Sequence, residues 1–194
     1  MEVLSGIFSA FGLSASAGLN AYIPLLVVSL LARYTSLIQL NSPWDTLTSG
    51  WIIGLLVVLA TVEFFADKAP LVNHVNDAIQ TFVRPAAGAI AFAASTQVID
   101  GINPVVALAA GLLVAGTVHV AKAGVMRPAV TSVSGGVANV AVGVVEDVAA
   151  VTLSIFSILI PFVVGIILIP LVAFLIWMMW RRANRSDLQK QASS

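Results

Sequence analysis

The sequence predicts an all-α fold, a polytopic membrane helical bundle with about six spans. Of its 194 residues, 59% are hydrophobic and 9% are charged, and the mean hydropathy is +1.03. Because a soluble domain carries about 25% charged residues, this composition indicates an integral membrane protein. The apolar residues form long runs between short polar connections. We therefore expect a single transmembrane domain over residues 1–194.

Charge and motifs narrow the function classes. Nine basic and nine acidic residues cancel, so nothing points to nucleic acid, and there is no cysteine for a disulfide or a thiolate metal site. The sequence has no His-Glu-x-x-His zinc pattern, no Gly-x-Ser-x-Gly elbow and no P-loop. We predict that the protein is not an enzyme and uses no cofactor. The expected partners are the lipid bilayer, a small ion or solute and, as one option, further copies of the chain in a homo-oligomer.

The first apolar run, residues 3–32, exceeds the roughly twenty residues of one upright span. It is interrupted at residues 17–20 and again at Pro24, which favours a broken, kinked or re-entrant helix. Glu2 stands where a cleaved signal peptide has positive charge, so we expect this run to be retained.

A polar connection, residues 33–50, leads to the second span at 51–65, near whose end Glu63 and Asp67 share a helix face. Residues 71–83 have a different pattern, with an apolar and a polar side at helical spacing. The apolar side is Leu71, Val72, Val75, Ile79 and Phe82, and the polar side is Asn73, His74, Asn76, Asp77, Gln80 and Thr81. We expect a separate helix that lies in the membrane interface or lines a vestibule, with its polar face solvated.

Four further spans and a polar tail complete the predicted bundle. Arg84-Pro85 is expected to start the third span, and a break is expected at residues 124–128, after the fourth. The predicted spans are residues 86–98, 105–122, 136–155 and 158–180, and the tail is 181–194. Basic residues in the tail predict that it is cytoplasmic, which with six spans places both termini in the cytoplasm. Arg33 departs from this pattern unless the first run is re-entrant.

The two halves of the chain resemble each other weakly. Residues 17–22 resemble residues 123–128, and each half then carries a Val-Glu pair ending in Glu63 or Glu146. Two copies of three spans, at 1–100 and 101–180, would lie in opposite orientations, as in many transporters and channels. Interrupted helices in such folds form an ion or substrate site near the middle of the membrane.

An ordered set of residues along nearly the whole chain resembles a bacterial membrane family, the domain of unknown function 4126. The set comprises residues 17–22, Glu63, Asp67, Lys68, Pro70, Asp77, Gln80, Thr81, Arg84, Pro85, Gly88, His119, Lys122, Ala123, Arg127, Asn139, Glu146 and Asp147. Asn20 departs from the basic residue expected at its position. The resemblance implies a multi-span inner-membrane protein, and it supplies no activity.

The charged residues inside apolar segments are the candidate site. A charged side chain at the centre of the bilayer costs roughly 2.5–3.5 kcal/mol on insertion scales. We therefore expect the several charges in these segments to pair with one another or to bind something polar. An antiparallel turn after residue 128 would bring Lys122 level with Glu146, which predicts an ion pair. The candidate pathway residues are Asn20, Glu63, Asp67, His119, Lys122, Arg127, Asn139, Glu146 and Asp147.

Three readings of this cluster remain open at the level of sequence. The first is a small transporter or channel for a small ion or polar solute, in which His119 exchanges protons and Lys122 and Arg127 supply a counter-charge or gate. The second is a membrane scaffold or lipid-binding protein whose buried charges fix helix register. The third, an enzyme acting on a lipid, would need a cavity that opens sideways to the bilayer.

Overall fold

The protein is an all-helical bundle of the membrane type, as the sequence predicts. The computed structural model describes residues 2–67, 70–96, 102–126 and 139–192, and this part of the chain has seven α-helices and no strand. The helices are α1 (Glu2–Leu19), α2 (Tyr22–Tyr34), α3 (Gly50–Ala66), α4 (Pro70–Thr96), α5 (Pro104–Ala121), α7 (Asn139–Leu159) and α8 (Pro161–Ala192), with a 3-10 turn η1 (Trp44–Thr48) and a π-turn η2 (Lys122–Met126). Three segments, Pro104–Gly124, Val140–Leu159 and Pro161–Arg181, are long and apolar enough to cross a bilayer.

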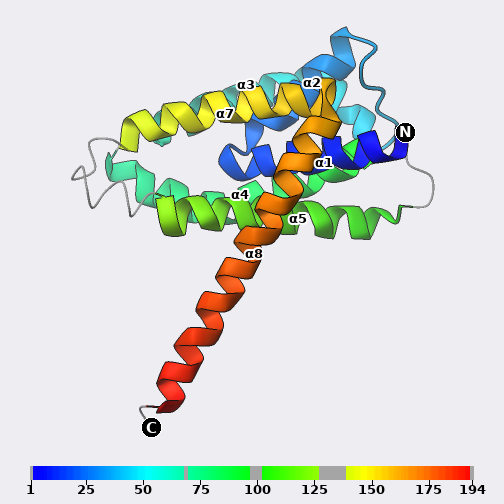
Figure 1. Ribbon diagram of the computed structural model, residues 1–194. Coiled ribbons are helices and arrows are strands. Elements are labelled where there is room, and N and C mark those ends of the chain that lie inside the picture. Colours follow the sequence, from blue (N-terminus) through cyan, green and yellow to red (C-terminus); the bar gives the residue numbers. More distant parts are fainter. Residues whose placement is uncertain (1, 68–69, 97–101, 127–138, 193–194) are drawn as a thin grey trace.

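The first apolar run forms a helical hairpin, which confirms the predicted break. α1 ends at Leu19, and α2 turns back toward the end of the molecule at which α1 begins (Figure 1). Leu13 of α1 and Val28 of α2 accordingly belong to one buried cluster. Pro24 does not interrupt the run a second time, because it lies in the first turn of α2. The backbone N–H groups of a first turn have no partner within the helix, so the N–H that proline lacks is not missed there.

α1 is the central helix of the bundle. It is almost wholly buried from residue 10 onward and packs against α4, α5, α7 and α8. Small residues permit this close packing: a Cβ added at Gly18 would lie 2.6 Å from the carbonyl oxygen of Ala115, and the Ser14 hydroxyl donates to the Gly111 carbonyl at 2.7 Å. Helices in membranes commonly approach through such residues. The site described below lies at the tip of the hairpin that α1 begins.

α4 corrects two predictions. The expected interface helix at 71–83 and the third span at 86–98 are one continuous helix, and Pro85 lies inside it. Buried neighbours can satisfy the carbonyl that a proline leaves without its donor, so prolines are tolerated in membrane helices. The polar side is also not wholly solvated. Asn76 and Gln80 are buried, Thr81 is exposed, and the side chains of Asn73, His74 and Asp77 lie outside the described residues. The apolar Phe82 is 79% exposed. This inside-out arrangement is expected of a helix surrounded by lipid.

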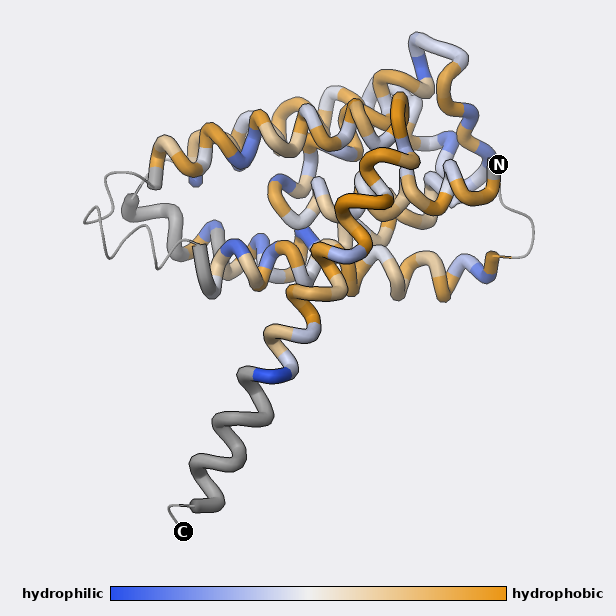
Figure 2. Tube along the Cα trace, in the orientation of Figure 1, coloured by the Kyte–Doolittle hydropathy of each residue, from blue (hydrophilic) through white to orange (hydrophobic). Residues whose placement is uncertain are grey.

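α8 extends further than the sequence predicts. It crosses the other helices and projects beyond them (Figure 1), and the residues of α8 that Figure 2 colours are mostly hydrophobic up to Arg181. The predicted polar tail at 181–194 is helical as far as Ala192. Residues 181–192 are rich in good helix formers and contain no glycine or proline to stop the helix. The internal repeat stays a prediction, because much of its second interruption, residues 127–138, lies outside the described residues.

Candidate functional site

The hairpin tip is a buried two-residue break between α1 and α2. The Asn20 side-chain oxygen accepts the backbone N–H groups of Tyr22 and Ile23, each at 3.1 Å. Asparagine is a favoured residue at such a position, because its oxygen replaces the partners that the first turn of a helix lacks. Asn20 is 1% exposed, so this capping takes place in the interior of the bundle.

The two helix ends at this break receive opposite charges. The Lys122 ammonium donates to the carbonyl of Leu19, the last residue of α1, at 2.9 Å. The backbone N–H of Ala21, which precedes α2, donates to Glu63 Oε2 at 3.2 Å. A helix carries partial negative charge at its C-terminus and partial positive charge at its N-terminus. The buried charges are therefore matched to the dipoles of the broken helix.

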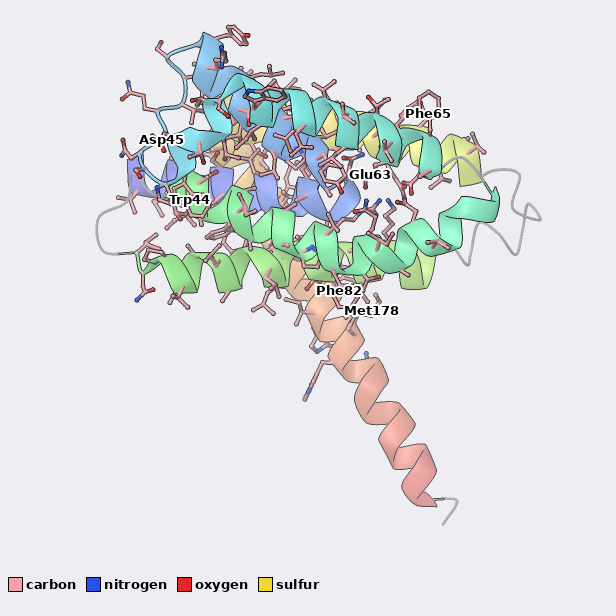
Figure 3. All side chains as sticks on the ribbon, turned by 180° about the vertical axis from the view of Figure 1, so that it is seen from behind. Trp44, Asp45, Glu63, Phe65, Phe82 and Met178 are labelled. Carbon is pink, nitrogen blue, oxygen red and sulfur yellow. The ribbon has the colours of Figure 1, made fainter. Side chains whose placement is uncertain are left out.

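On the α2 side, Glu63 of α3 pairs with Arg84 of α4. The guanidinium of Arg84 donates to Glu63 Oε1 from Nη2 at 2.8 Å and from Nε at 3.2 Å, and its Nη2 is also 3.4 Å from Asp67 Oδ2. Arg84 is 0% exposed and Glu63 is 1% exposed. Asn76 donates to the other Asp67 oxygen at 2.6 Å. Figure 3 shows Glu63 on the inner side of α3, between the helices.

His119 joins the same group from α5. Its Nδ1 lies 3.3 Å from Arg84 Nη1, and its Nε2 lies 3.3 Å from the Thr81 hydroxyl. Because a guanidinium can only donate, Nδ1 accepts, and Nε2 carries the proton of a neutral ring. We call Glu63, Asp67, Asn76, Thr81, Arg84 and His119 the Glu63 cluster.

On the α1 side, the predicted ion pair between Lys122 and Glu146 is present, with Nζ 2.8 Å from Oε2. Both side chains are buried, at 2% and 4% exposure. One residue further along α7, Asp147 accepts a hydrogen bond from the Asn20 amide at 2.9 Å. We call Asn20, Lys122, Glu146 and Asp147 the Glu146 cluster.

The structure gathers seven of the nine predicted site residues around the hairpin tip. These are Asn20, Glu63, Asp67, His119, Lys122, Glu146 and Asp147. Arg127 lies outside the described residues, as does the side chain of Asn139.

Three members of the Glu63 cluster are not among the predicted site residues: Asn76, Thr81 and Arg84. Arg84 is the most important of them, because it lies within α4 at the centre of the cluster and not at the start of a span. A signal was present in the sequence: Asn76, Gln80 and Arg84 recur every four residues and so lie on one face of a helix that continues through Pro85.

A cavity of about 300 Å³ opens beside the hairpin tip, between α2, α3 and α7. It is lined by Asn20, Ile23, Leu26, Val57, Ala60, Thr61, Phe64 and Asp147. Asn20 and Asp147 of the Glu146 cluster thus line this cavity, whereas its lining includes neither Glu63 nor Glu146. A second cavity of about 330 Å³, between α1, α5, α7 and α8, is apolar except for Lys122.

The described residues hold no group of three or more His, Cys, Asp or Glu side chains arranged to bind a metal ion. No curated protein and no solved structure matches the chain. The sequence profile of one family matches residues 7–181, a range that contains both clusters and the hairpin tip. The resemblance inferred from the sequence is thereby confirmed, and the chain belongs to the family described as domain of unknown function 4126 (DUF4126).

Proposed function

We propose that the protein is a small membrane transporter or channel for a small ion or polar solute. The observation that supports this most is the break between α1 and α2, with Lys122 on one helix end and Glu63 on the other. Discontinuous helices with charges at their ends form the substrate and ion sites of many transporters. A helix that served only to span the bilayer would need neither the break nor the charges.

Lys122 suggests how a cation would enter the site. Its ammonium lies between the Leu19 carbonyl oxygen and the Glu146 carboxylate, two oxygen ligands that hard cations prefer. Lysine is a point charge on a flexible stem, so it can leave these oxygens without rearranging the helices. In this proposal an incoming cation replaces the ammonium at Leu19 and Glu146. Asn20 and Asp147, which line the cavity, form the approach.

The Glu63 cluster has a supporting role in this proposal. Arg84 bridges Glu63 and Asp67 and fixes α3 against α4. Glu63 in turn holds the N–H of Ala21 and with it the start of α2. His119 is held neutral between Arg84 and Thr81, which suits a positioning residue better than the proton exchange suggested by its sequence position.

A second candidate is a non-catalytic membrane scaffold or lipid-binding protein. The close pairing of Arg84 with Glu63 and of Lys122 with Glu146 favours it, because buried ion pairs can fix helix register without any other role. Under this alternative, Glu146→Gln and Lys122→Met would leave the cellular function intact. Changes on the 71–83 stretch of α4 would abolish it.

The site of action is part of the proposal. We propose that the protein acts in a bacterial inner membrane and catalyses no reaction. We also propose that copies of the chain can form a homo-oligomer. The placement of both termini in the cytoplasm stays a prediction. Reporter fusions to each terminus test it.

Flux in reconstituted liposomes tests the function. Vesicles that contain the protein are loaded with dyes for H⁺, Na⁺ and K⁺, and wild type is compared with Glu146→Gln and with Asp45→Asn. The Asp45 carboxylate lies in the exposed turn η1, so this second variant is a matched control for the loss of one carboxylate charge. We expect wild-type flux from Asp45→Asn and at least about tenfold less from Glu146→Gln. Equal flux from wild type and Glu146→Gln for every ion would contradict the proposal.

A further inference from the structure

The second cavity, between α1, α5, α7 and α8, is lined almost wholly by hydrocarbon. Its volume of about 330 Å³ is within the range of about 300–1,000 Å³ for small-molecule pockets. Ten of its eleven lining residues are apolar, and five of those ten belong to α8. The eleventh is Lys122, whose ammonium already donates to the Leu19 carbonyl and pairs with Glu146. The walls therefore favour an apolar chain and need no charged group inside the cavity.

The cavity opens toward the bilayer along α8. Val172 of α8 is buried in one cluster with Ala15 of α1 and Val114 of α5. Its neighbour Leu171 also lines the cavity but is 48% exposed, so the edge of the cavity lies on the outer surface of the bundle. Met178 lines the cavity near the point at which α8 projects beyond the other helices (Figure 3). Because the exposed lining is apolar, a ligand enters from the lipid.

The lining on α8 extends over the depth of one lipid leaflet. It begins at Leu168 and ends at Met178, which corresponds to about 15 Å of helix at about 1.5 Å per residue. This length is half of a hydrocarbon core of about 30 Å. In the apolar segment Pro161–Arg181, Leu168 is near the middle and Met178 is near the end. The cavity therefore suits a lipid chain that extends from the membrane surface toward the middle of the bilayer.

Arg181 lies beside the end of the cavity that is nearer the membrane surface. It follows Met178 by three residues and so lies on the same side of α8. Its side chain is exposed, and its guanidinium carbon is 5.1 Å from the centre of the Trp177 ring. Stacking of this kind uses the face of the guanidinium and leaves the N–H groups at its edge, which match the oxygens of a phosphate. A phosphate at the head of a chain in the cavity would be within reach of these groups.

We infer that the cavity binds one acyl chain of an anionic phospholipid, whose phosphate pairs with Arg181. The chain lies along α8 from Met178 to Leu168. A choline headgroup is less favourable, because its ammonium would face the guanidinium with like charge. The inference goes beyond the proposed transport, because lipid bound at equilibrium requires no movement across the membrane. The site is also separate from the 71–83 stretch of α4 on which the lipid-binding alternative depends.

Lipid titration followed by native mass spectrometry tests the inference. The purified full chain in uncharged detergent is titrated with dioleoyl phosphatidylglycerol, with dioleoyl phosphatidylcholine and with glycerol phosphate. We expect one phosphatidylglycerol per chain to bind at least about tenfold more tightly than any further copy and than phosphatidylcholine. Glycerol phosphate, which has the phosphate but no chain, should not compete at equal concentration. Equal affinity for the two lipids, or full competition by glycerol phosphate, would overturn the inference.

Arg181→Gln tests the headgroup contact. It should weaken the binding of phosphatidylglycerol by about fivefold or more and remove its advantage over phosphatidylcholine. The matched control is Arg33→Gln, because Arg33 is also an exposed arginine stacked on a neighbouring ring, that of Tyr34 at 5.7 Å, but is not adjacent to a residue of the cavity lining. Arg33→Gln should bind the lipid like wild type. Wild-type affinity in Arg181→Gln, or an equal loss in the two variants, would overturn the inference.

Ala121→Phe tests the place of the chain. The larger side chain fills part of the cavity and should lower the affinity of the first phosphatidylglycerol to that of further copies. Ala109→Phe, on the exposed face of the same helix, is the control and should bind like wild type. Wild-type binding by Ala121→Phe would place the lipid outside the cavity and overturn the inference. If Ala121→Phe does not fold, dihexanoyl phosphatidylglycerol decides, because its chains are too short to follow the lining to Leu168. It should bind at least about tenfold more weakly than the dioleoyl lipid, and equal affinity would also overturn the inference.

Discussion

The Glu63 and Glu146 clusters serve opposite ends of the same helix break but are built differently. In the Glu63 cluster, one fully buried arginine bridges two carboxylates, and an imidazole and an amide complete the group. In the Glu146 cluster, one lysine divides its hydrogen bonds between a carboxylate and a backbone carbonyl. Arginine presents donors in a rigid plane, whereas lysine is a flexible point charge. The Glu63 cluster is therefore suited to holding the helices in place. In the Glu146 cluster, another cation can replace the Lys122 ammonium.

One carboxylate also differs from the others in access. Asp147 lines an open-sided cavity and is partly exposed, whereas Glu63, Asp67 and Glu146 are at most 5% exposed. We therefore assign the holding of the hairpin to the Glu63 cluster and the handling of a ligand to the Glu146 cluster. The following substitutions separate stability from function and so test this division.

The largest loss of stability is expected from Arg84→Met. It leaves Glu63 buried without its strongest partner, and breaking a buried ion pair in this way costs about 3–5 kcal/mol. Thermal unfolding of the purified protein in detergent should show a strongly lowered Tm or no folded protein. The added change Glu63→Gln should restore part of the Tm. A wild-type Tm for Arg84→Met alone would remove the basis for calling the cluster structural.

Lys122→Met should affect both stability and flux. It removes the partner of Glu146 and the donor to the Leu19 carbonyl, with an expected loss of about 2–4 kcal/mol. Flux in liposomes, normalised to folded protein, should fall to background because the exchangeable cation is lost. Wild-type flux per folded molecule of Lys122→Met would contradict the exchange mechanism, and the ion pair would then have only a structural role.

A matched pair on α4 tests its inside-out orientation. Asn76→Leu removes a buried donor to Asp67 and should lower stability by about 1–2 kcal/mol. Phe82→Leu changes a side chain that is 79% exposed and should stay within about 0.5 kcal/mol of wild type. Chemical or thermal unfolding of both variants makes the comparison. If Phe82→Leu were the more damaging, the assignment of the lipid-facing side would be reversed.

Asp147→Asn should lower stability less than Lys122→Met does and still reduce flux. The asparagine can accept the same hydrogen bond from Asn20, so a loss of about 1 kcal/mol is expected. Flux of a cation should nevertheless decrease, because the approach loses its negative charge. Unchanged flux at unchanged stability would exclude Asp147 from the pathway.

The sequence predicts the class of fold and one side of the site well. The long apolar runs and the small residues at 17–20 correctly indicate a membrane bundle with a broken first segment. The Lys122–Glu146 pair also agrees with the sequence, because an antiparallel turn predicted after residue 128 brings the two residues level. Such a contact between consecutive spans can be predicted from helix periodicity.

The Glu63 cluster could not be assembled in the same way. Its contacts join α3, α4 and α5, so they depend on tertiary packing that no sequence spacing encodes. Pro85 suggested a helix start and thereby moved Arg84 to the membrane surface, although the helix continues through the proline. The amphipathic pattern of residues 71–83 predicts a helix in the membrane interface or beside a vestibule, with a solvated polar side. The bundle instead buries Asn76 and Gln80 of that side.

The most direct test of the division between the clusters compares two charge-neutral double variants. One combines Glu63→Gln with Arg84→Met, and the other combines Glu146→Gln with Lys122→Met, so that each removes one acidic and one basic side chain and leaves the net charge unchanged. Cation flux per folded molecule is measured for both in liposomes. Our account predicts flux like that of wild type from the first variant and background flux from the second. Equal flux from the two variants, or the reverse order, would contradict it.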